Sequence, residues 1–161
     1  MNMHKYEKIW LYIGSGTLLF FLIVVGISAF YMGNKPPSCA VTLDPERVRE
    51  HQLFKEPGLT EIGDNEYQLN IVASAFDYDV GTDDKVVKIP KGATVHISST
   101  TTDVIHGFQI AGTNVNMMLE PGYISTYTNT FDKEGTYTLV CNEYCGVGHH
   151  LMHATIEVVD E

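Results

Sequence analysis

The chain has 161 residues and a formal net charge of −10, and this length fits one modest domain plus an additional segment. Residues 1–35 hold three Lys and one Glu, a net of +2, so residues 36–161 carry −12. Nucleic-acid phosphates would repel so acidic a domain, which excludes nucleic acid as a partner; a basic protein partner and plain solubility both remain open.

An uncharged apolar run lies close to the N-terminus. Residues 9–32 form 24 consecutive positions without Asp, Glu, Lys or Arg. A membrane-spanning helix needs roughly 20 such residues, whereas the apolar region of a secretory signal peptide, the competing interpretation, has only about 7–15. The run therefore predicts a single transmembrane anchor within residues 1–35. Lys5 and Lys8 precede it, and positively charged flanks stay on the cytoplasmic side. We expect a cytoplasmic N-terminus and a following domain on the outer face of the cell (plasma) membrane.

Residues 36–65 are predicted to form a linker with one short helix. Pro36 and Pro37 mark the break after the anchor, because prolines stop helices. The sequence Asp44-Pro45-Glu46 supplies an N-cap, a Pro at the first helical position and an early acid. These signals predict a helix over about residues 45–54. Residues 58–65 are expected to form a loop.

From residue 66 the pattern changes to short β-rich segments separated by turns. Turn signals such as Pro90-Lys-Gly and Glu120-Pro-Gly fall between these segments. Seven or so strands in about 95 residues favour a mainly β fold, a Greek-key sandwich or barrel, over residues 66–161. The clearest predicted strands are residues 67–72, 86–89, 94–97, 123–128, 136–140 and 154–159.

Metal-binding side chains are concentrated between the last two predicted strands. The stretch Cys141-Asn-Glu-Tyr-Cys145-Gly-Val-Gly-His149-His-Leu-Met152 holds two thiols, an imidazole and a thioether. Copper prefers soft or borderline ligands of this kind. The stretch would be a loop at one end of the sandwich, where a rigid β scaffold usually mounts its ligands. The sequence therefore predicts a metal site there.

A second imidazole would have to come from elsewhere in the chain. His106, between two predicted strands, is the candidate. His149 is favoured over His150 because it gives equal three-residue gaps along the Cys-Cys-His series. We expect His150 and His153 to be ordinary residues that bind no metal.

Three other arrangements compete for these residues. An exported pair of cysteines could form a disulfide, but a disulfide explains neither the following His and Met nor His106. Zinc could take two Cys and two His, which leaves Met152 without a role. A mononuclear copper site needs one Cys, two His and a weak axial Met, so one cysteine is surplus. A second thiolate is what bridging two coppers requires, and the extra cysteine therefore favours a dinuclear site.

The pattern Cys-x3-Cys-x3-His-x2-Met, preceded by Asp103-Val-Ile-His106, resembles the dinuclear copper-A motif of cytochrome c oxidase subunit II. The resemblance implies a cupredoxin-like copper-A domain over residues 66–161, with the N-terminal helix as its anchor. A single membrane span and the Asp-Val-Ile-His-Gly-Phe sequence are similar to the B-family branch of haem–copper oxidases.

The resemblance also implies a role for each ligand. Cys141 and Cys145 would both bridge the two coppers. His106 and His149 would each bind one copper, and Met152 would bind one of them weakly. The backbone carbonyl of Glu143 would be the remaining ligand, and the Glu143 side chain resembles a magnesium ligand of the family.

Two further groups of residues complete the predicted site. Many members of the family carry a Trp near the copper through which electrons enter, whereas the only tryptophan here is Trp10, in the membrane span. Phe76 and Tyr78 are expected to line that surface instead. Apolar side chains are expected to exclude water from the copper site, or simply to pack in the core: Phe108, Met117, Met118 and Leu119.

The function implied by the resemblance is that of the electron-accepting subunit of a respiratory terminal oxidase. Cytochrome c, soluble or tethered to the membrane, would deliver electrons, and a haem-bearing subunit I would receive them and reduce oxygen. We further hypothesise that acidic residues near the site steer a basic cytochrome c: Asp77, Asp79, Asp83 and Asp84. A stand-alone, membrane-tethered copper electron carrier is the alternative. A copper-lacking quinol oxidase subunit is excluded, because all five side-chain ligands are present.

Overall fold

The computed structural model describes residues 3–32 and 37–160, without the side chains of Cys39 and Ala40. The chain divides into two compact units, residues 1–36 and 37–161. The predicted boundary between anchor and linker falls on residues 33–36, which lie outside the described residues. Each unit is described by itself below.

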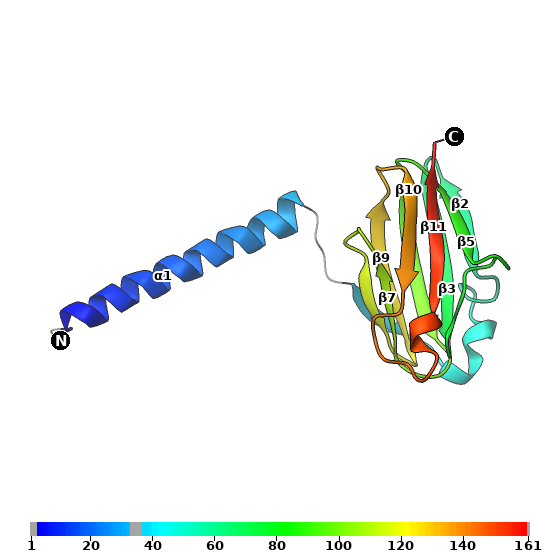
Figure 1. Cartoon of the computed structure of the whole chain (residues 1–161), viewed down its shortest axis with the longest axis horizontal. Coiled ribbons are helices and arrows are strands. Elements are labelled where there is room, and N and C mark those ends of the chain that lie inside the picture. The colour runs from blue at the N-terminus through cyan, green and yellow to red at the C-terminus, as the bar shows by residue number, and fades with distance from the viewer. Residues whose placement is uncertain (1–2, 33–36, 161) are drawn as a thin grey trace. The chain divides into compact units, whose positions relative to one another are not determined.

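The N-terminal unit is one long helix (Figure 1). Helix α1 (Lys5–Gly26) continues as one π-helical segment, η1 (Ile27–Tyr31). The Glu7 carboxylate accepts the N–H of His4, the N-cap residue, across 2.9 Å, so the helix begins with a satisfied backbone donor. The 27 residues from Lys5 to Tyr31 include the uncharged run that begins at Ile9, none of them is buried within the chain, and their length and hydropathy suit a membrane span. At 1.5 Å per residue they extend about 40 Å, longer than a hydrocarbon core of about 30 Å.

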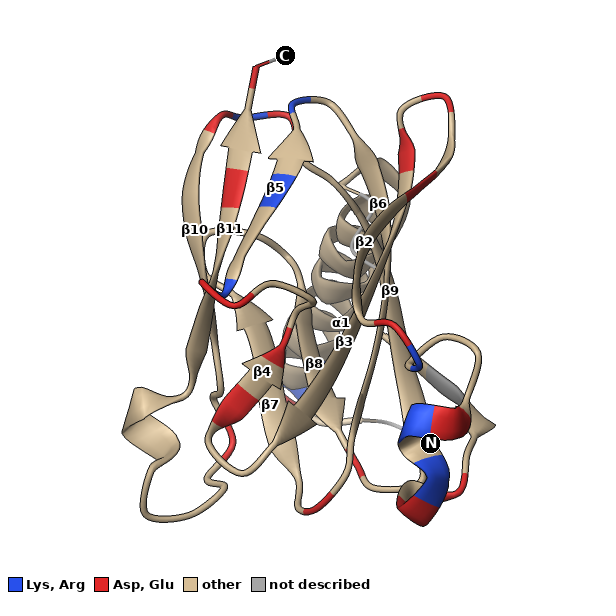
Figure 2. Ribbon diagram, turned by 90° about the vertical axis from the view of Figure 1, so that its right-hand side faces the viewer, with Lys and Arg blue, Asp and Glu red and all other residues tan. Residues whose placement is uncertain are grey.

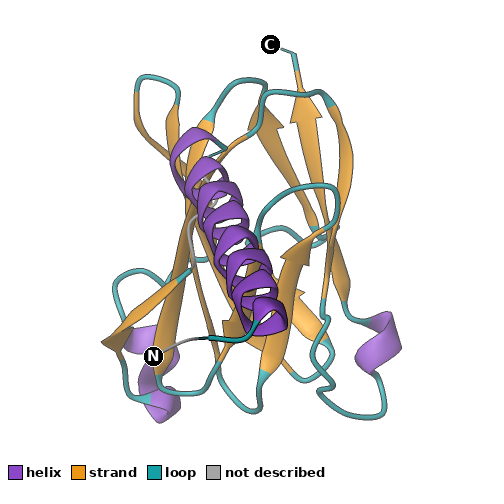
Figure 3. Cartoon of the chain, turned by 90° about the vertical axis from the view of Figure 1, so that its left-hand side faces the viewer, coloured by secondary structure: helices purple, strands orange, loops and turns teal. Residues whose placement is uncertain are grey.

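The second unit is a sandwich of two β-sheets (Figures 1 and 3). The first sheet has the strand order β1-β9-β6-β3-β2, with β4 paired to β3, and the second has the order β5-β11-β10-β7-β8. Pairing is antiparallel except for β3 with β6 and β5 with β11. The bounds of the first sheet are β1 Ser38–Thr42, β2 Gly58–Gly63, β3 Glu66–Ser74, β4 Asp77–Asp79, β6 Thr94–Thr101 and β9 Tyr123–Thr130. Those of the second are β5 Val86–Pro90, β7 His106–Ile110, β8 Asn116–Leu119, β10 Gly135–Val140 and β11 His153–Val159.

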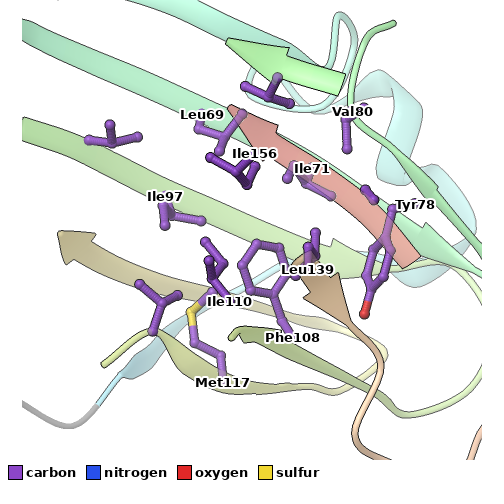
Figure 4. Close-up of a cluster of buried hydrophobic side chains, with 14 of the residues drawn as sticks. Leu69, Ile71, Tyr78, Val80, Ile97, Phe108, Ile110, Met117, Leu139 and Ile156 are labelled. Atoms are coloured by element: carbon purple, nitrogen blue, oxygen red, sulfur yellow. The ribbon is translucent and has the colours of Figure 1, made fainter. Parts of the chain in front are cut away.

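The core fills the space between the two sheets, because alternate side chains of each strand point inward. Figure 4 shows inward residues such as Leu69 and Ile71 of β3 facing Phe108 and Ile110 of β7. Strand β11 alternates regularly: Ala154, Ile156 and Val158 are buried while the residues between them are partly exposed. The sandwich and the N-terminal apolar helix confirm the predicted fold class.

Residues 36–65 contribute more regular structure than predicted. The expected loop at residues 58–65 is wrong: β2 pairs with β3 along the edge of the first sheet. The predicted helix begins where expected, at Pro45, with the Asp44 carboxylate accepting the N–H of Glu46 across 3.0 Å. It is a 3-10 helix, η2 (Pro45–Glu50), and ends four residues earlier than expected. Val48 and Phe54 are buried against the sheet. Side-chain packing therefore determines the conformation of this segment after the helix ends.

Two neighbouring strands bring the predicted ligands to one end of the sandwich. Strand β10 ends at Val140 and pairs there with His153, the first residue of β11. The loop of residues 141–152 is therefore held at both of its ends (Figure 1). His106 begins β7, which pairs with β10 on its other side. The register of three strands in one sheet thus places the ligands together.

Candidate metal centre

The two thiols of the loop lie side by side. Cys141 Sγ is 3.7 Å from Cys145 Sγ, far beyond a disulfide bond of about 2.05 Å. Both cysteines are free, so the structure does not contain the disulfide considered above. The Cys141 thiol donates to the backbone carbonyl of Glu143 across 3.1 Å and accepts the N–H of Gly107 at 3.4 Å. That carbonyl is the one implied as a copper ligand.

Each thiol has its own imidazole. His106 Nδ1 is 3.9 Å from Cys141 Sγ, and His149 Nδ1 is 3.6 Å from Cys145 Sγ. Met152 Sδ lies 3.8 Å from Cys145 Sγ. His106, Cys141 and Met152 are buried, whereas Cys145 and His149 are partly exposed. The five side chains predicted from the sequence therefore meet at one place.

These distances fit donor atoms that share metal ions. A thiolate binds a metal ion such as zinc at about 2.3 Å and an imidazole at about 2.0 Å. Two donors on one ion can therefore be at most about 4.6 Å apart if both are thiolates, or about 4.3 Å for a thiolate with an imidazole. All three sulfur–sulfur and sulfur–imidazole contacts of the cysteines given above satisfy these limits. Among the described residues, the ligand atoms of His106, Cys141 and Cys145 lie within 4.8 Å of one another.

Burial keeps the Cys145 thiol protonated in the metal-free chain. Loss of water around the sulfur, with the hydrogen bond and charge of Cys141, raises the pKa of Cys145 to about 11. The nearby backbone of Phe76 opposes this and lowers the pKa. Both cysteines must lose their protons to bind metal, so metal binding releases protons here.

Asp103 holds His106 in place. Its Oδ1 accepts from His106 Nε2 at 2.8 Å and from the Val104 N–H at 2.7 Å, and its other oxygen accepts the Ala75 N–H. Partial burial of the carboxylate raises its pKa, but the hydrogen bonds from His106, Val104, Ala75 and Thr101 outweigh it and lower the pKa overall. The sequence motif includes Asp103, but no role was predicted for it. Its position three residues before a ligand histidine is the feature that could have indicated this role.

Gly107 is a second residue whose role the sequence did not reveal. A Cβ at this position would lie 1.9 Å from the side-chain oxygen of Asn142 and 2.5 Å from its backbone nitrogen. Only glycine therefore lets β7 approach the ligand loop closely enough for its N–H to reach Cys141. The feature that could have indicated this close approach is a glycine directly after the candidate histidine. That segment was not predicted to be a strand.

The two aromatic residues predicted to line the surface differ in position. Phe76 is 36% exposed beside the ligand loop. Tyr78 is fully buried, and Figure 4 shows it within the core near Ile71 and Phe108. Its hydroxyl donates to the backbone carbonyl of Gly107. Burial and the neighbouring Cys141 raise the pKa of Tyr78 far above its ordinary range. The prediction that Tyr78 lines the surface is therefore wrong, because β4 turns it inward.

The acidic residues near the site are partly neutralised. Figure 2 shows the acids on β4, and both form ion pairs. Asp77 lies 3.0 Å from Lys85 Nζ, and Asp79 lies 2.7 Å from Arg49. These two carboxylates are thus poor candidates for steering a basic partner.

The remaining predicted residues fall into two groups. Phe108, Met117 and Leu119 are buried in the core, whereas Met118 is exposed, because it occupies the outward position of β8. His150 and His153 are exposed. The His153 ring lies 2.8 Å from the Leu151 carbonyl.

Comparison with known proteins gives consistent results. Residues 61–159 match the family model described as cytochrome c oxidase subunit II, periplasmic domain. One cytochrome c oxidase subunit 2 of Thermus thermophilus is 34% identical over 157 residues, covering 95% of this chain and 91% of that protein. A second subunit 2 from Thermus thermophilus is 38% identical over 118 residues, covering 72% of this chain and 84% of that protein. A chain in a cryo-EM structure of a haem–copper terminal oxidase dimer superposes with a TM-score of 0.82 at 34% identity, covering 96% of this chain and all of that one.

Proposed function

Because this chain belongs to the cytochrome c oxidase subunit II family, whose members are the subunits through which electrons enter a haem–copper terminal oxidase, we propose that it accepts those electrons at a dinuclear copper-A centre. The proposed ligands are Cys141, Cys145, His106, His149, Met152 and the carbonyl of Glu143.

One observation carries the dinuclear assignment: the two cysteine sulfurs lie 3.7 Å apart, and each has a different imidazole beside it. A mononuclear copper site of one Cys, two His and Met leaves the second thiol without a role. Here that thiol is buried, faces the other sulfur and has its own histidine. If both sulfurs were shared by two copper ions, each ion would have one imidazole, and both thiols and both imidazoles would have a role.

Copper would supply reversible one-electron chemistry, and the protein's contribution is to hold the ligands in one arrangement. Asp103 fixes the His106 ring, and the N–H of Gly107 donates to the Cys141 sulfur. Met152 is buried and covers the apolar side of the site beside Cys145. The 3.1 Å contact between Cys141 Sγ and the Glu143 carbonyl holds the loop backbone close to the thiols. Ligands held in this way move little when the charge of the centre changes, which favours rapid electron transfer.

The partners follow from the family and from the charge of the chain. A haem-bearing subunit I is the acceptor, since the similar solved chain belongs to a haem–copper oxidase. We propose cytochrome c as the donor and the B-family as the branch. The Glu143 side chain is exposed, and we propose that it binds magnesium together with groups of the partner subunit, because a single carboxylate rarely holds that ion.

The N-terminal helix anchors the chain in a membrane, as expected for a subunit of a membrane oxidase. We propose that the N-terminus is cytoplasmic and that the copper domain lies on the outer face of the plasma membrane, because Lys5 and Lys8 precede the apolar run. The stand-alone carrier is not favoured, because the similarity to oxidase subunits extends over the helix as well as the sandwich.

A metal count with electron paramagnetic resonance tests the centre. The full chain, purified in detergent and loaded with copper, should bind two coppers and share one unpaired electron between them, which gives a seven-line hyperfine pattern. Cys141→Ser should abolish that pattern, while His150→Ala, a neighbouring histidine outside the ligand set, should leave it unchanged. One copper with a four-line pattern in the unmodified chain would contradict the proposal.

A further inference from the structure

Phe76 has an unusual backbone conformation. Its φ is +67°, in the left-handed region that bulky residues rarely adopt. A conformation of this kind persists only where the surrounding structure holds it, and such residues cluster at functional sites. Phe76 lies in the short connection between β3 and β4, directly beside the ligand loop.

The Phe76 ring packs on the segment that joins two of the ligands. A Cβ at Gly148 would lie 2.5 Å from the ring, and a Cβ at Gly146 would lie 3.1 Å from it. Both glycines belong to the stretch between Cys145 and His149, so only a chain without side chains at these positions can lie against the ring. The Phe76 ring therefore contacts the segment at both of its glycines.

The residues on either side of Phe76 reach the other half of the site. The Ala75 N–H donates to the carboxylate of Asp103, which holds His106. The Tyr78 hydroxyl donates to the carbonyl of Gly107, the residue that follows His106. Ala75 thus contacts the residue that supports His106, and Tyr78 contacts the residue whose N–H donates to Cys141.

We propose that the segment Ala75–Tyr78, the β3–β4 connection and the start of β4, is a brace that positions the copper ligands, with Phe76 as its principal positioning residue. This inference rests on the proposed copper centre and adds a role to Phe76 besides lining the surface. The ring fixes the Cys145–His149 segment and covers it with apolar surface. Hydrophobic surroundings of a cysteine sulfur tune the reduction potential of copper sites, and water admitted by loss of the ring would favour the more highly charged, oxidised centre.

The test uses the full chain in detergent, loaded with copper, in four forms: unmodified, Phe76→Ala, Phe76→Tyr and Val147→Ala. Three quantities are measured: copper release to a chelator, the hyperfine pattern and the midpoint potential. Phe76→Ala should release copper roughly tenfold faster or more, as expected when a group supporting a ligand is lost. Its hyperfine pattern should change and its potential should fall.

Phe76→Tyr should leave all three quantities closer to those of the unmodified chain than Phe76→Ala does, because it keeps an aromatic ring beside the two glycines. Val147 is the matched control: it lies between the two glycines, is 86% exposed and should be replaceable without effect. Should Phe76→Ala fail to fold, Phe76→Gly decides in its place, since glycine adopts a positive φ freely. The glycine variant keeps the N–H and lacks only the ring.

Two results would separate this inference from the proposed function. If Phe76→Ala or Phe76→Gly keeps the unmodified release rate, hyperfine pattern and potential, the brace is wrong even if electron uptake slows. If the unmodified chain itself binds one copper with a four-line pattern, the dinuclear centre is wrong, whatever the variants do.

Discussion

The Asp103 carboxylate accepts a hydrogen bond from Nε2 of His106 across 2.8 Å. His106 is fully buried, so Asp103 determines which ring nitrogen carries the proton and leaves Nδ1 facing Cys141. Partners of this kind orient ligand histidines and raise their basicity. The relationship gives two predictions, one for the copper-loaded chain and one for the metal-free chain.

Asp103→Asn should weaken copper binding by about 10–100-fold, the usual cost of losing a partner behind a ligand histidine. The substitution keeps the size of the side chain but removes its charge and puts an amide donor where the Ala75 or His106 donor now binds. Competition with a chelator measures the affinity. Asp64→Asn, in the exposed turn between β2 and β3, is the control. Equal affinities for the two variants would contradict the prediction.

The metal-free chain should lose the contribution of Asp103 at low pH. The folded structure lowers the pKa of Asp103, so its hydrogen bonds stabilise the fold above the unfolded pKa of about 3.9 and are lost as pH falls through the lower, folded value. Urea unfolding of the unmodified chain and of Asp103→Asn measures this. Their stability difference should be constant above about pH 5 and shrink below about pH 4. A stability difference that grows as the pH falls would contradict the lowered pKa of Asp103.

Gly107→Ala should destabilise the sandwich by about 1–3 kcal/mol, because an added Cβ overlaps the backbone and side chain of Asn142. The nearest obstacle includes backbone atoms of the ligand loop, which cannot move without displacing Cys141. Gly63→Ala is the matched control: the nearest atom to its Cβ would be 3.5 Å away, an ordinary contact. Denaturant unfolding of the metal-free chain measures both. If Gly107→Ala is as stable as Gly63→Ala, the ligand loop moves aside at little cost in free energy and the prediction is wrong.

Local sequence pattern was sufficient where an element has a regular period or a distinctive set of side chains. Strands β3, β5, β6, β9, β10 and β11 were predicted because apolar and β-branched residues alternate between turn signals. The metal-binding side chains were found because thiol, imidazole and thioether groups lie close together in sequence. His106, 35 residues before Cys141, was placed by chemical need and by resemblance, and the register of β7 with β10 brings it to the site.

The remaining features depend on tertiary contacts that sequence pattern does not reveal. Strand β4 has the sequence Asp77-Tyr78-Asp79, and nothing in those three residues says which faces inward. Its pairing with β3 buries Tyr78. Lys85, in the loop that follows β4, and Arg49, far earlier in the chain, neutralise the two acids. Strand β2 was missed because glycines begin and end it, although the neighbouring β3 supplies its hydrogen bonds.

The Cys145 thiol of the metal-free chain should react slowly with an alkylating reagent at pH 8. Its pKa is raised to about 11, chiefly by burial, so little thiolate exists at that pH compared with an ordinary cysteine of pKa about 8.5. Peptide mapping by mass spectrometry follows Cys145 separately from the other cysteines. Its rate should rise up to about pH 11, and unfolding in urea should remove the delay at pH 8. Rapid modification of the folded chain at pH 8 would contradict the raised pKa.

The steering hypothesis now rests on Asp83 and Asp84, since the two β4 acids are in ion pairs. These residues lie in the loop before β5, and the carbonyl of Lys85 in that loop accepts the N–H of Thr155, near the start of β11 at the site end of the sandwich. Asp84 Oδ1 accepts the Val86 N–H at 3.2 Å, a bond that an Asn oxygen can also make, so the double Asn variant should keep the loop intact.

Replacing both residues with Asn should slow electron uptake from a basic cytochrome c several-fold at about 10 mM ionic strength, where charges act over about 30 Å. The difference should vanish near 1 M, where screening shortens that range to about 3 Å. Stopped-flow measurements on the copper-loaded chain give the rates. Glu157→Gln, an acid on the outer side of β11 away from the copper loop, is the control for the loss of negative charge. A rate that responds to salt equally in the double variant and in the unmodified chain would assign steering to the overall charge of the domain instead of to these two residues.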